Sequence, residues 1–246
     1  MSISTSLPPQ SQIVYPEDDG EPMAENTVQF RWIVTIKEGL EKVFRDRPDV
    51  FVAGDLLWYP VEGQPETRQA PDAMVVFGRP KGDRGSYMQW VEGGIAPQVV
   101  FEILSPGNRY RYKQMVKKFD FYQRYGVEEY YVYDPESFEL DGWKRSGEKL
   151  EEILEMNGWV SPRLGVRFDR SQGELILIDP AGQRFLTYGE LALERDAIAL
   201  ERDAVALERD AVARERDAIA RELSTERERA ERLAAQMRSL GVEPHS

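Results

Sequence analysis

The sequence predicts a mixed α/β domain that is followed by a long C-terminal helix. Three observations support this prediction. Short apolar runs bounded by proline and glycine recur between residues 50 and 187, as is typical of strands. The segments 27–45 and 111–125 show the apolar spacing of helices. From Leu193 onward, strong helix formers repeat every seven residues, with no glycine or proline before Gly241.

Composition restricts the chemistry that the chain can perform. The 246 residues suffice for one sizeable core and an extension. There is no cysteine, and His245 is the one histidine, so cysteine-built zinc sites and histidine-based triads are not expected in the domain. Acid/base chemistry then depends on carboxylates, lysine, tyrosine or metal-bound water.

Charge and hydropathy indicate where the protein works. The net charge of −12 argues against a broadly basic nucleic-acid-binding surface, although it allows a local basic patch. The N-terminus lacks the pattern of a signal peptide, and no stretch is apolar over the length of a membrane span. We therefore expect a cytoplasmic protein without a membrane partner.

Four regions follow along the chain. Residues 1–25 are rich in proline, serine and acids, which predicts a flexible arm. Residues 26–187 form the α/β domain, residues 188–240 the helical tail with the seven-residue repeat, and residues 241–246 a disordered end.

The elements of the domain can be assigned in order. In the first helix, residues 27–45, the apolar positions are Phe30, Ile33, Ile36, Leu40 and Val43. Strands are expected within VFVAGDLLWYP, DAMVVFG, QVVFEILSP and EEYYVYDP. The second helix, RYKQMVKKFDFYQRY, ends at Gly126. Further strands and hairpins are expected in FELDGWKRSG, KLEEILEMNGWV and ELILIDPAGQRFLTY.

The tail has the periodicity of a coiled coil. Its heptad leucines at position d are Leu193, Leu200 and Leu207, and its alanines at position a are Ala197, Ala204 and Ala211. Glutamate and aspartate then occupy positions e and g, where they would repel an identical partner. We expect homo- or hetero-oligomers through residues 190–236, without a tight self-dimer being assured. A solvated single helix is the alternative.

The strand at residues 98–106 contains a carboxylate, Glu102, within an apolar run. Such a group is costly to bury unless it is paired or coordinates a cation. Asp72 opens a neighbouring strand, and two carboxylates on adjacent strands can hold a divalent cation such as Mg²⁺ for phosphodiester hydrolysis. The alternative is that Asp72 caps a turn and that Glu102 pairs with an arginine or lysine of the core.

The order of PDAMVVFG and QVVFEILSPGNRYRYKQMVKKFDFYQRYGVEEYYVYDP resembles the Uma2-like restriction endonucleases of the PD-(D/E)XK nuclease superfamily, over most of residues 25–187. The resemblance implies a restriction-endonuclease-like core with a mixed central sheet. It also implies an endonuclease that hydrolyses DNA with water activated by Mg²⁺ or Mn²⁺. Asp72 and Glu102 would be metal carboxylates, and the backbone carbonyl of Ile103 an additional ligand.

The chain departs from the superfamily pattern at Leu104, where a lysine is expected two residues after the glutamate. The resembling family usually has a lysine of the following helix instead, and Lys117 and Lys118 are the candidates. Lys118 borders the buried face marked by Met115 and Tyr122, whereas Lys117 points away from it. We predict Lys118 as the catalytic lysine; the alternative is a lysine whose stem covers the edge of the core.

A local basic stretch predicts DNA as the partner. Between residues 107 and 125, six basic residues face one acid, a charge of +5, and tyrosines lie between them. This combination suits phosphate contact and base stacking. The predicted DNA contacts are Arg109, Arg111, Lys113 and Lys117. Leu104 and the acidic total charge leave an alternative, an inactive nuclease-like binding or adaptor module that acts through its helical tail.

Overall fold

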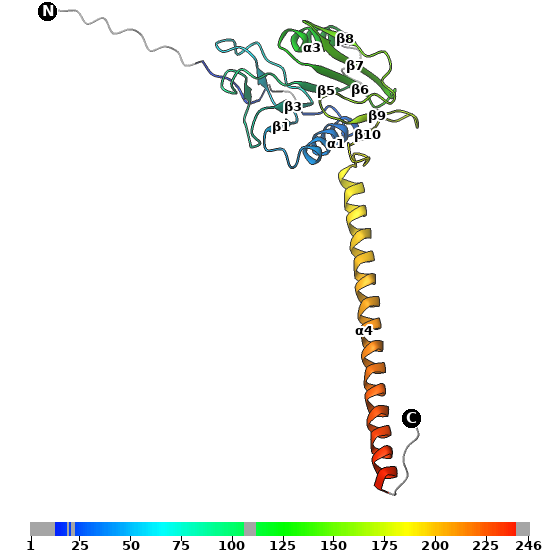
Figure 1. The fold of residues 1–246 in the computed structure, drawn as a ribbon. Coiled ribbons are helices and arrows are strands. Elements are labelled where there is room, and N and C mark those ends of the chain that lie inside the picture. The colour runs from blue at the N-terminus through cyan, green and yellow to red at the C-terminus, as the bar shows by residue number, and fades with distance from the viewer. Residues whose placement is uncertain (1–12, 19, 21–22, 106–111, 240–246) are drawn as a thin grey trace, which may run out of the picture. The chain divides into compact units, whose positions relative to one another are not determined.

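The computed structural model describes residues 13–18, 20, 23–105 and 112–239. The chain divides into two compact units, residues 1–188 and 189–246, which we consider separately. Among the described residues, the first unit holds all the strands and two helices, and the second is helical (Figure 1).

A six-stranded sheet forms the centre of the first unit, in the order β1-β3-β5-β6-β7-β8. Its strands are β1 (Val50–Ala53), β3 (Ala73–Phe77), β5 (Val99–Ile103), β6 (Glu129–Asp134), β7 (Glu139–Ser146) and β8 (Lys149–Glu152). Strands β5 and β6 are parallel, and the other neighbours are antiparallel. The predicted mixed central sheet is therefore confirmed.

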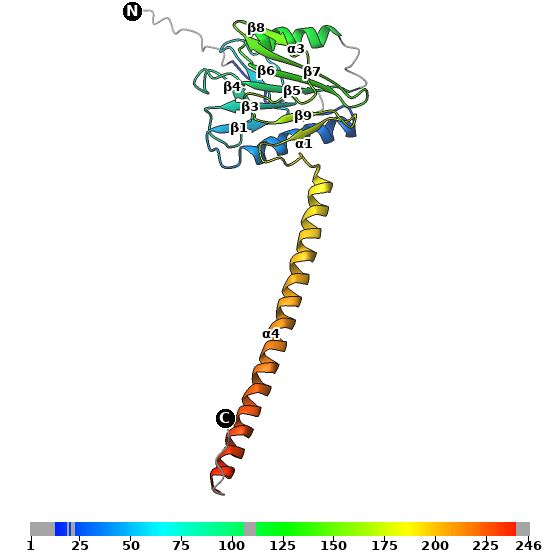
Figure 2. The same ribbon diagram turned by 45° about the vertical axis from the view of Figure 1, so that its right-hand side comes forward.

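Two helices cover opposite faces of this sheet (Figures 1 and 2). Helix α1 (Thr27–Val43) packs on the face that carries Phe101 and Ile103. Helix α3 (Tyr112–Arg124) lies between the parallel strands β5 and β6 in sequence, as a crossover connection requires. It packs on the other face, where Tyr122 joins Val100 in a second core cluster. The strand alternation predicted around Glu102 therefore holds, and Glu102 faces α3.

Two small strand pairs complete the unit. Strand β2 (Trp58–Tyr59) pairs with β4 (Tyr87–Met88) in parallel, and β9 (Arg167–Asp169) pairs with β10 (Ile176–Ile178) in antiparallel orientation. The sequence analysis assigned neither β4 nor β9, because two or three residues are too few to show a period of two.

The first helix differs from its prediction at one position that matters for the site. The side chain of Asn26 caps the helix by accepting hydrogen bonds from the backbone N–H groups of Val28 and Gln29. Phe30, assigned to the apolar face, is 49% exposed, whereas Gln29 is 5% exposed. The assignment of Phe30 was wrong. Residues 29 and 30 lie four and three positions before Ile33, so helical spacing allows either of them on the buried face, and in the structure it is the polar Gln29 that lies inward.

Part of the predicted flexible arm packs on the body. The ring of Tyr15 lies 5.3 Å from that of Tyr59 and 5.0 Å from that of Trp90, measured between centroids. The Tyr59 hydroxyl donates to the carbonyl of Pro16 at 2.6 Å. Residues 1–12 and 241–246, which complete the predicted arm and the predicted disordered end, lie outside the described residues.

The second unit contains helix α4 (Tyr188–Ser239), whose 52 residues match the predicted long helix. None of its described side chains is buried. In the repeat, arginines pair with the next residue: Arg195–Asp196, Arg202–Asp203, Arg209–Asp210 and Arg216–Asp217. Exposed pairs of this kind contribute little to stability. The coiled coil and the oligomer through residues 190–236 stay predictions. Among the described helices, none combines the length and apolar character needed to cross a bilayer.

Deleting residues 190–246 is expected to leave the stability of the first unit nearly unchanged, with a loss below about 1 kcal/mol. Both core clusters consist of residues before 188, so the truncated chain keeps its whole core. Thermal unfolding followed by circular dichroism in the near ultraviolet checks this. A large drop in melting temperature would show that α4 stabilises the body.

Candidate functional site

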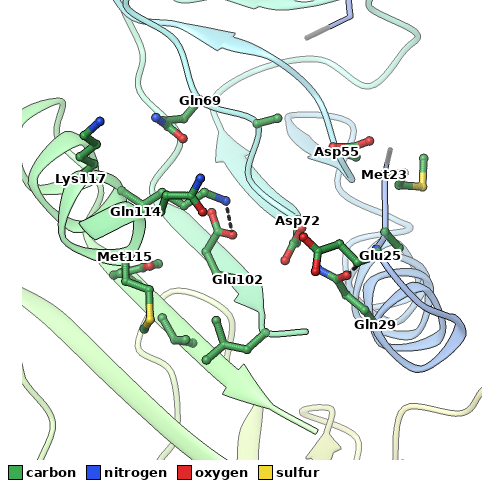
Figure 3. A pocket seen from close by; sticks show the side chains of 16 residues that line it. Met23, Glu25, Gln29, Asp55, Gln69, Asp72, Glu102, Gln114, Met115 and Lys117 are labelled. Carbon is green, nitrogen blue, oxygen red and sulfur yellow. Dashed lines mark hydrogen bonds and ion pairs between the residues drawn. The ribbon is translucent and has the colours of Figure 1, made fainter. Parts of the chain in front are cut away.

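A pocket with a volume of about 380 Å³ lies beside the ends of β3 and β5 (Figure 3). Its walls come from the N-terminal end of α1, from α3 and from the loops near residues 55 and 70. The polar residues that line it are Glu25, Gln29, Asp55, Gln69, Asp72, Glu102, Gln114, Lys117, Lys118 and Tyr130. All three predicted catalytic residues, Asp72, Glu102 and Lys118, therefore share one pocket.

The strand register places Asp72 and Glu102 next to each other. Ala73 of β3 is opposite Phe101 of β5, and the two carboxylates lie one position beyond this pair. Asp72 Oδ2 accepts a hydrogen bond of 2.5 Å from the backbone N–H of Ile103, which ties the end of β3 to that of β5. Asp72 and Glu102 are 8% and 5% exposed. The juxtaposition follows from antiparallel pairing of two strands that each end in this pocket.

Both carboxylate oxygens of Glu102 are engaged by α3. Lys118 Nζ donates to Oε2 at 2.5 Å, and the Tyr122 hydroxyl donates to Oε1 at 2.5 Å. Lys118 and Tyr122 are four residues apart, so they lie on the same face of the helix. These contacts offset the cost of burying a carboxylate in an apolar strand.

The ion pair between Lys118 and Glu102 is also what the alternative interpretation predicts, in which Glu102 pairs with a lysine or arginine of the core. However, the Lys118 side chain is 31% exposed and lines the pocket, so the pair lies at the wall of a cavity. Buried charge pairs within a closed core are not a source of function by themselves, whereas a charge pair facing a pocket can meet a ligand.

Burial and the neighbouring charges set the protonation of the site. Burial raises the pKa of Asp72 well above its usual range, and the charge of Glu102 raises it further. Lys118 and the Ile103 N–H group partly oppose this. For Lys118, burial lowers the pKa, but the charges of Glu102 and Asp72 outweigh that effect and raise it overall. The ammonium group of Lys118 therefore stays protonated at neutral pH.

The raised pKa of Asp72 predicts how the stability of the metal-free protein changes with pH. The folded protein binds this proton more tightly than the unfolded chain, so Asp72 costs stability as the pH rises above the ordinary value of 3.8. Each pKa unit between the two states is worth about 1.36 kcal/mol. In EDTA, Asp72→Asn should therefore unfold at a higher temperature than the wild type at pH 7–8. This gain should shrink toward pH 4. A gain that is equal at all pH values would contradict the assignment to Asp72.

The structure separates the two candidate lysines. Lys117 is exposed, and its side chain points away from Glu102 (Figure 3). Lys118 reaches the carboxylate. The other predicted DNA contacts cannot be placed, because Arg109, Arg111 and the side chain of Lys113 lie outside the described residues.

Gln29 is a site residue that the sequence analysis missed. Its Nε2 donates to the carbonyl of Ile103 at 2.9 Å, and its Oε1 accepts from the backbone N–H of Glu25 at 2.8 Å. The carbonyl predicted as a metal ligand thus already has one partner, although an oxygen of this type can accept twice. The available signal was a polar residue on the buried stripe that continues to Ile33 and Ile36.

Asp55 is a second residue that was missed. It follows β1 in a turn with a φ of 47°, a left-handed conformation that is costly for a residue with a side chain. Its backbone N–H donates to the carbonyls of Pro71, at 3.1 Å, and Asp72, at 3.3 Å. These bonds place Asp55 at the pocket, where its charge also raises the pKa of Asp72 and of Lys118. The Gly-Asp pair at residues 54–55 was the signal for this turn.

Comparison with known proteins adds the family. Residues 19–175 match the model of the Uma2 family, whose description is "Putative restriction endonuclease". The chain belongs to the Uma2 family. The Uma2 match spans more than half of the sequence, includes Asp72, Glu102 and Lys118, and ends before α4. The predicted resemblance is therefore confirmed.

A solved structure is similar to this Uma2 chain. It is the crystal structure of "a putative nuclease belonging to DUF820" from Anabaena variabilis. The similarity has a TM-score of 0.42 at 15% sequence identity and covers 59% of this chain and 79% of the other. A comparison with curated proteins finds no match.

The donor atoms of the pocket suit a hard divalent cation. Among the described residues, no group of three or more histidine, cysteine, aspartate or glutamate side chains is arranged to hold a metal ion. Mg²⁺, however, usually uses only one or two carboxylates together with waters and substrate phosphate. Asp72, Glu102 and the Ile103 carbonyl offer oxygen atoms alone, which Mg²⁺ and Mn²⁺ prefer. The cation would also compensate the buried charge of Asp72.

Proposed function

We propose that this Uma2-family protein is an endonuclease that hydrolyses DNA phosphodiester bonds and depends on Mg²⁺ or Mn²⁺. The observation that carries the proposal is the convergence of two buried carboxylates and one ammonium group on a single pocket. Such a set can hold a cation and a phosphate together, because it offers oxygen ligands for the first and a positive charge for the second.

The roles follow from position and charge. Asp72 and Glu102 would hold the ion, and the carbonyl of Ile103 would contribute its second lone pair. When bound, the ion would supply Lewis-acid stabilisation of the phosphate and a lowered pKa for a bound water. Asp72 also accepts the Ile103 N–H bond, so the strand ends that carry the two ligands are held together.

Lys118 acts as a hydrogen-bond donor and a positive charge, not as a base. Its pKa is raised, so it has no free lone pair at neutral pH. Its N–H groups can orient the attacking water or stabilise negative charge that develops on the phosphate, which replaces the lysine absent at Leu104. Tyr122 and Gln29 are positioning residues, since they contact Glu102 and the Ile103 carbonyl.

A plasmid nicking assay tests the proposed function. Purified full-length protein is incubated with supercoiled DNA and Mg²⁺ or Mn²⁺, and an identical sample contains EDTA. We expect relaxed and linear DNA only when the metal is present. Absence of cleavage with either metal, over a range of pH and salt, would reject the endonuclease.

An inactive binding or adaptor module is the second candidate. The usual lysine is absent, because Leu104 occupies its position. The helix α4 exposes leucines that would offer an apolar surface for binding a partner, among them Leu193, Leu200 and Leu207. In this case the protein would bind DNA in a mobility-shift assay without cutting it, and residues 190–236 would supply the association with another helix. The mass of the full chain in light scattering, compared with that of a chain truncated after residue 189, tests whether α4 associates with itself.

A further inference from the structure

Lys118 occupies the oxygen of Glu102 that faces the pocket. Lys118 donates to Oε2 and is among the residues that line the pocket, whereas Tyr122 donates to Oε1, is fully buried and is not among them. Figure 3 shows the bond to Lys118 as the dashed line that ends on Glu102. A cation that enters the pocket therefore meets the oxygen that already carries an ammonium group.

An ammonium at 2.5 Å and a divalent cation on the same oxygen would lie within about 4 Å of each other, and the repulsion between their charges opposes binding of both at once. Resting on the proposed function, we propose that Lys118 is a built-in competitor of the metal. It neutralises Glu102 in the metal-free protein, and its positive charge beside Oε2 weakens coordination of an ion there until the ammonium withdraws.

The surroundings allow this exchange. Tyr122 is locked in the core, stacked parallel to Trp58 with ring centroids 6.3 Å apart, so it keeps Glu102 oriented when Lys118 leaves. Lys118 has a long, flexible side chain that is partly exposed beside the cavity. Its ammonium can thus turn into the pocket without moving the helix.

The displaced ammonium needs another anion, and the phosphate of the substrate is the one that the proposed function brings. DNA would then favour release of Lys118 from Glu102, and metal and DNA would each strengthen the binding of the other, since such coupling is reciprocal. In the absence of DNA the site would bind metal weakly. Lys118 would therefore restrict metal loading to the complex with substrate.

Mn²⁺ binding measured without DNA tests the inference, because it does not depend on activity. Free Mn²⁺ is followed by electron paramagnetic resonance in titrations of the wild type and of Lys118→Met, Lys118→Arg and Lys117→Met. Lys118→Met keeps the stem and removes the charge, so its affinity should rise at least about tenfold. Lys118→Arg keeps the charge and should bind as weakly as the wild type. Lys117→Met removes an exposed charge on the preceding residue and should change the affinity for Mn²⁺ less than about twofold.

Each outcome has a distinct meaning. Tighter binding by Lys118→Met alone, including the case in which the wild type binds too weakly to measure, supports competition. If the wild type binds Mn²⁺ and Lys118→Met binds equally or more weakly, the inference is wrong and the proposed function stands. If no variant binds Mn²⁺, the inference is wrong, and the nicking assay decides the proposed function, since substrate phosphate can complete the shell of the metal. Circular dichroism verifies folding, and Lys118→Gln, which keeps a donor without the charge, replaces Lys118→Met if that variant does not fold.

Discussion

Asp72→Asn and Glu102→Gln should each slow metal-dependent plasmid nicking by about 10³-fold. A metal Lewis acid stabilises the transition state by several kcal/mol, and about 1.36 kcal/mol corresponds to a factor of ten. Both changes keep the size of the side chain. Asn at position 72 can still accept from the Ile103 N–H, and Gln at position 102 can still accept from Tyr122, so the loss reports on the missing charge.

Glu129→Gln is the matched control for these two variants. Glu129 is a buried carboxylate at the start of β6, paired with Val99 at the other end of the parallel strands, and it accepts from Tyr131 and from the Arg163 N–H. Glu129→Gln removes a buried charge outside the pocket, so the folded variant should cleave DNA at the wild-type rate. Nicking by Asp72→Asn at the wild-type rate would mean that the activity belongs to another site or another protein.

Lys118→Met should lower the cleavage rate at saturating Mn²⁺ and DNA by about 10²–10³-fold, the usual effect of removing one electrostatic donor from a transition state. Saturating metal is necessary because this variant is also expected to bind Mn²⁺ more tightly. Lys117→Met should instead leave the maximal rate within about twofold. It should raise the KM for DNA and reduce its salt dependence, as loss of a phosphate contact does. Single-turnover cleavage at several salt concentrations separates the two effects.

Lys118→Met also removes one of two partners of a buried carboxylate. Its melting temperature should fall, because Glu102 keeps only the Tyr122 hydroxyl, and breaking a buried pair is costly. The measured rate therefore refers to the fraction that is folded. If folded Lys118→Met cleaves normally while Lys117→Met does not, Lys118 is a structural partner of Glu102 and the roles of the two lysines are reversed.

The sequence by itself determined the longer elements and the faces of the strand that carries Glu102, but not the short strands β4 and β9. Alternation in QVVFEILSP placed Glu102 on one face of the strand and Phe101 and Ile103 on the other face. The structure agrees, because Phe101 and Ile103 belong to one core cluster, whereas Val100, on the face of Glu102, belongs to the other. Helical spacing placed Lys118, and not Lys117, at the border of the buried face, and Lys118 is the residue that reaches Glu102. These features were predictable because they depend on periods of two and 3.6 residues, which any local stretch displays.

Only the tertiary structure decided which groups share the pocket and what they contact. Gln29 donates to the carbonyl of Ile103 across 74 residues of sequence, and Asp55 reaches the site from a strained turn. The occupation of both Glu102 oxygens, by Lys118 and Tyr122, depends on how α3 docks on the sheet. Contacts of this kind are set by strand register and helix docking, where a displacement of two residues along a strand keeps every side chain on its face but exchanges its partners. The sequence period stays the same under that displacement, so it cannot select among the alternatives.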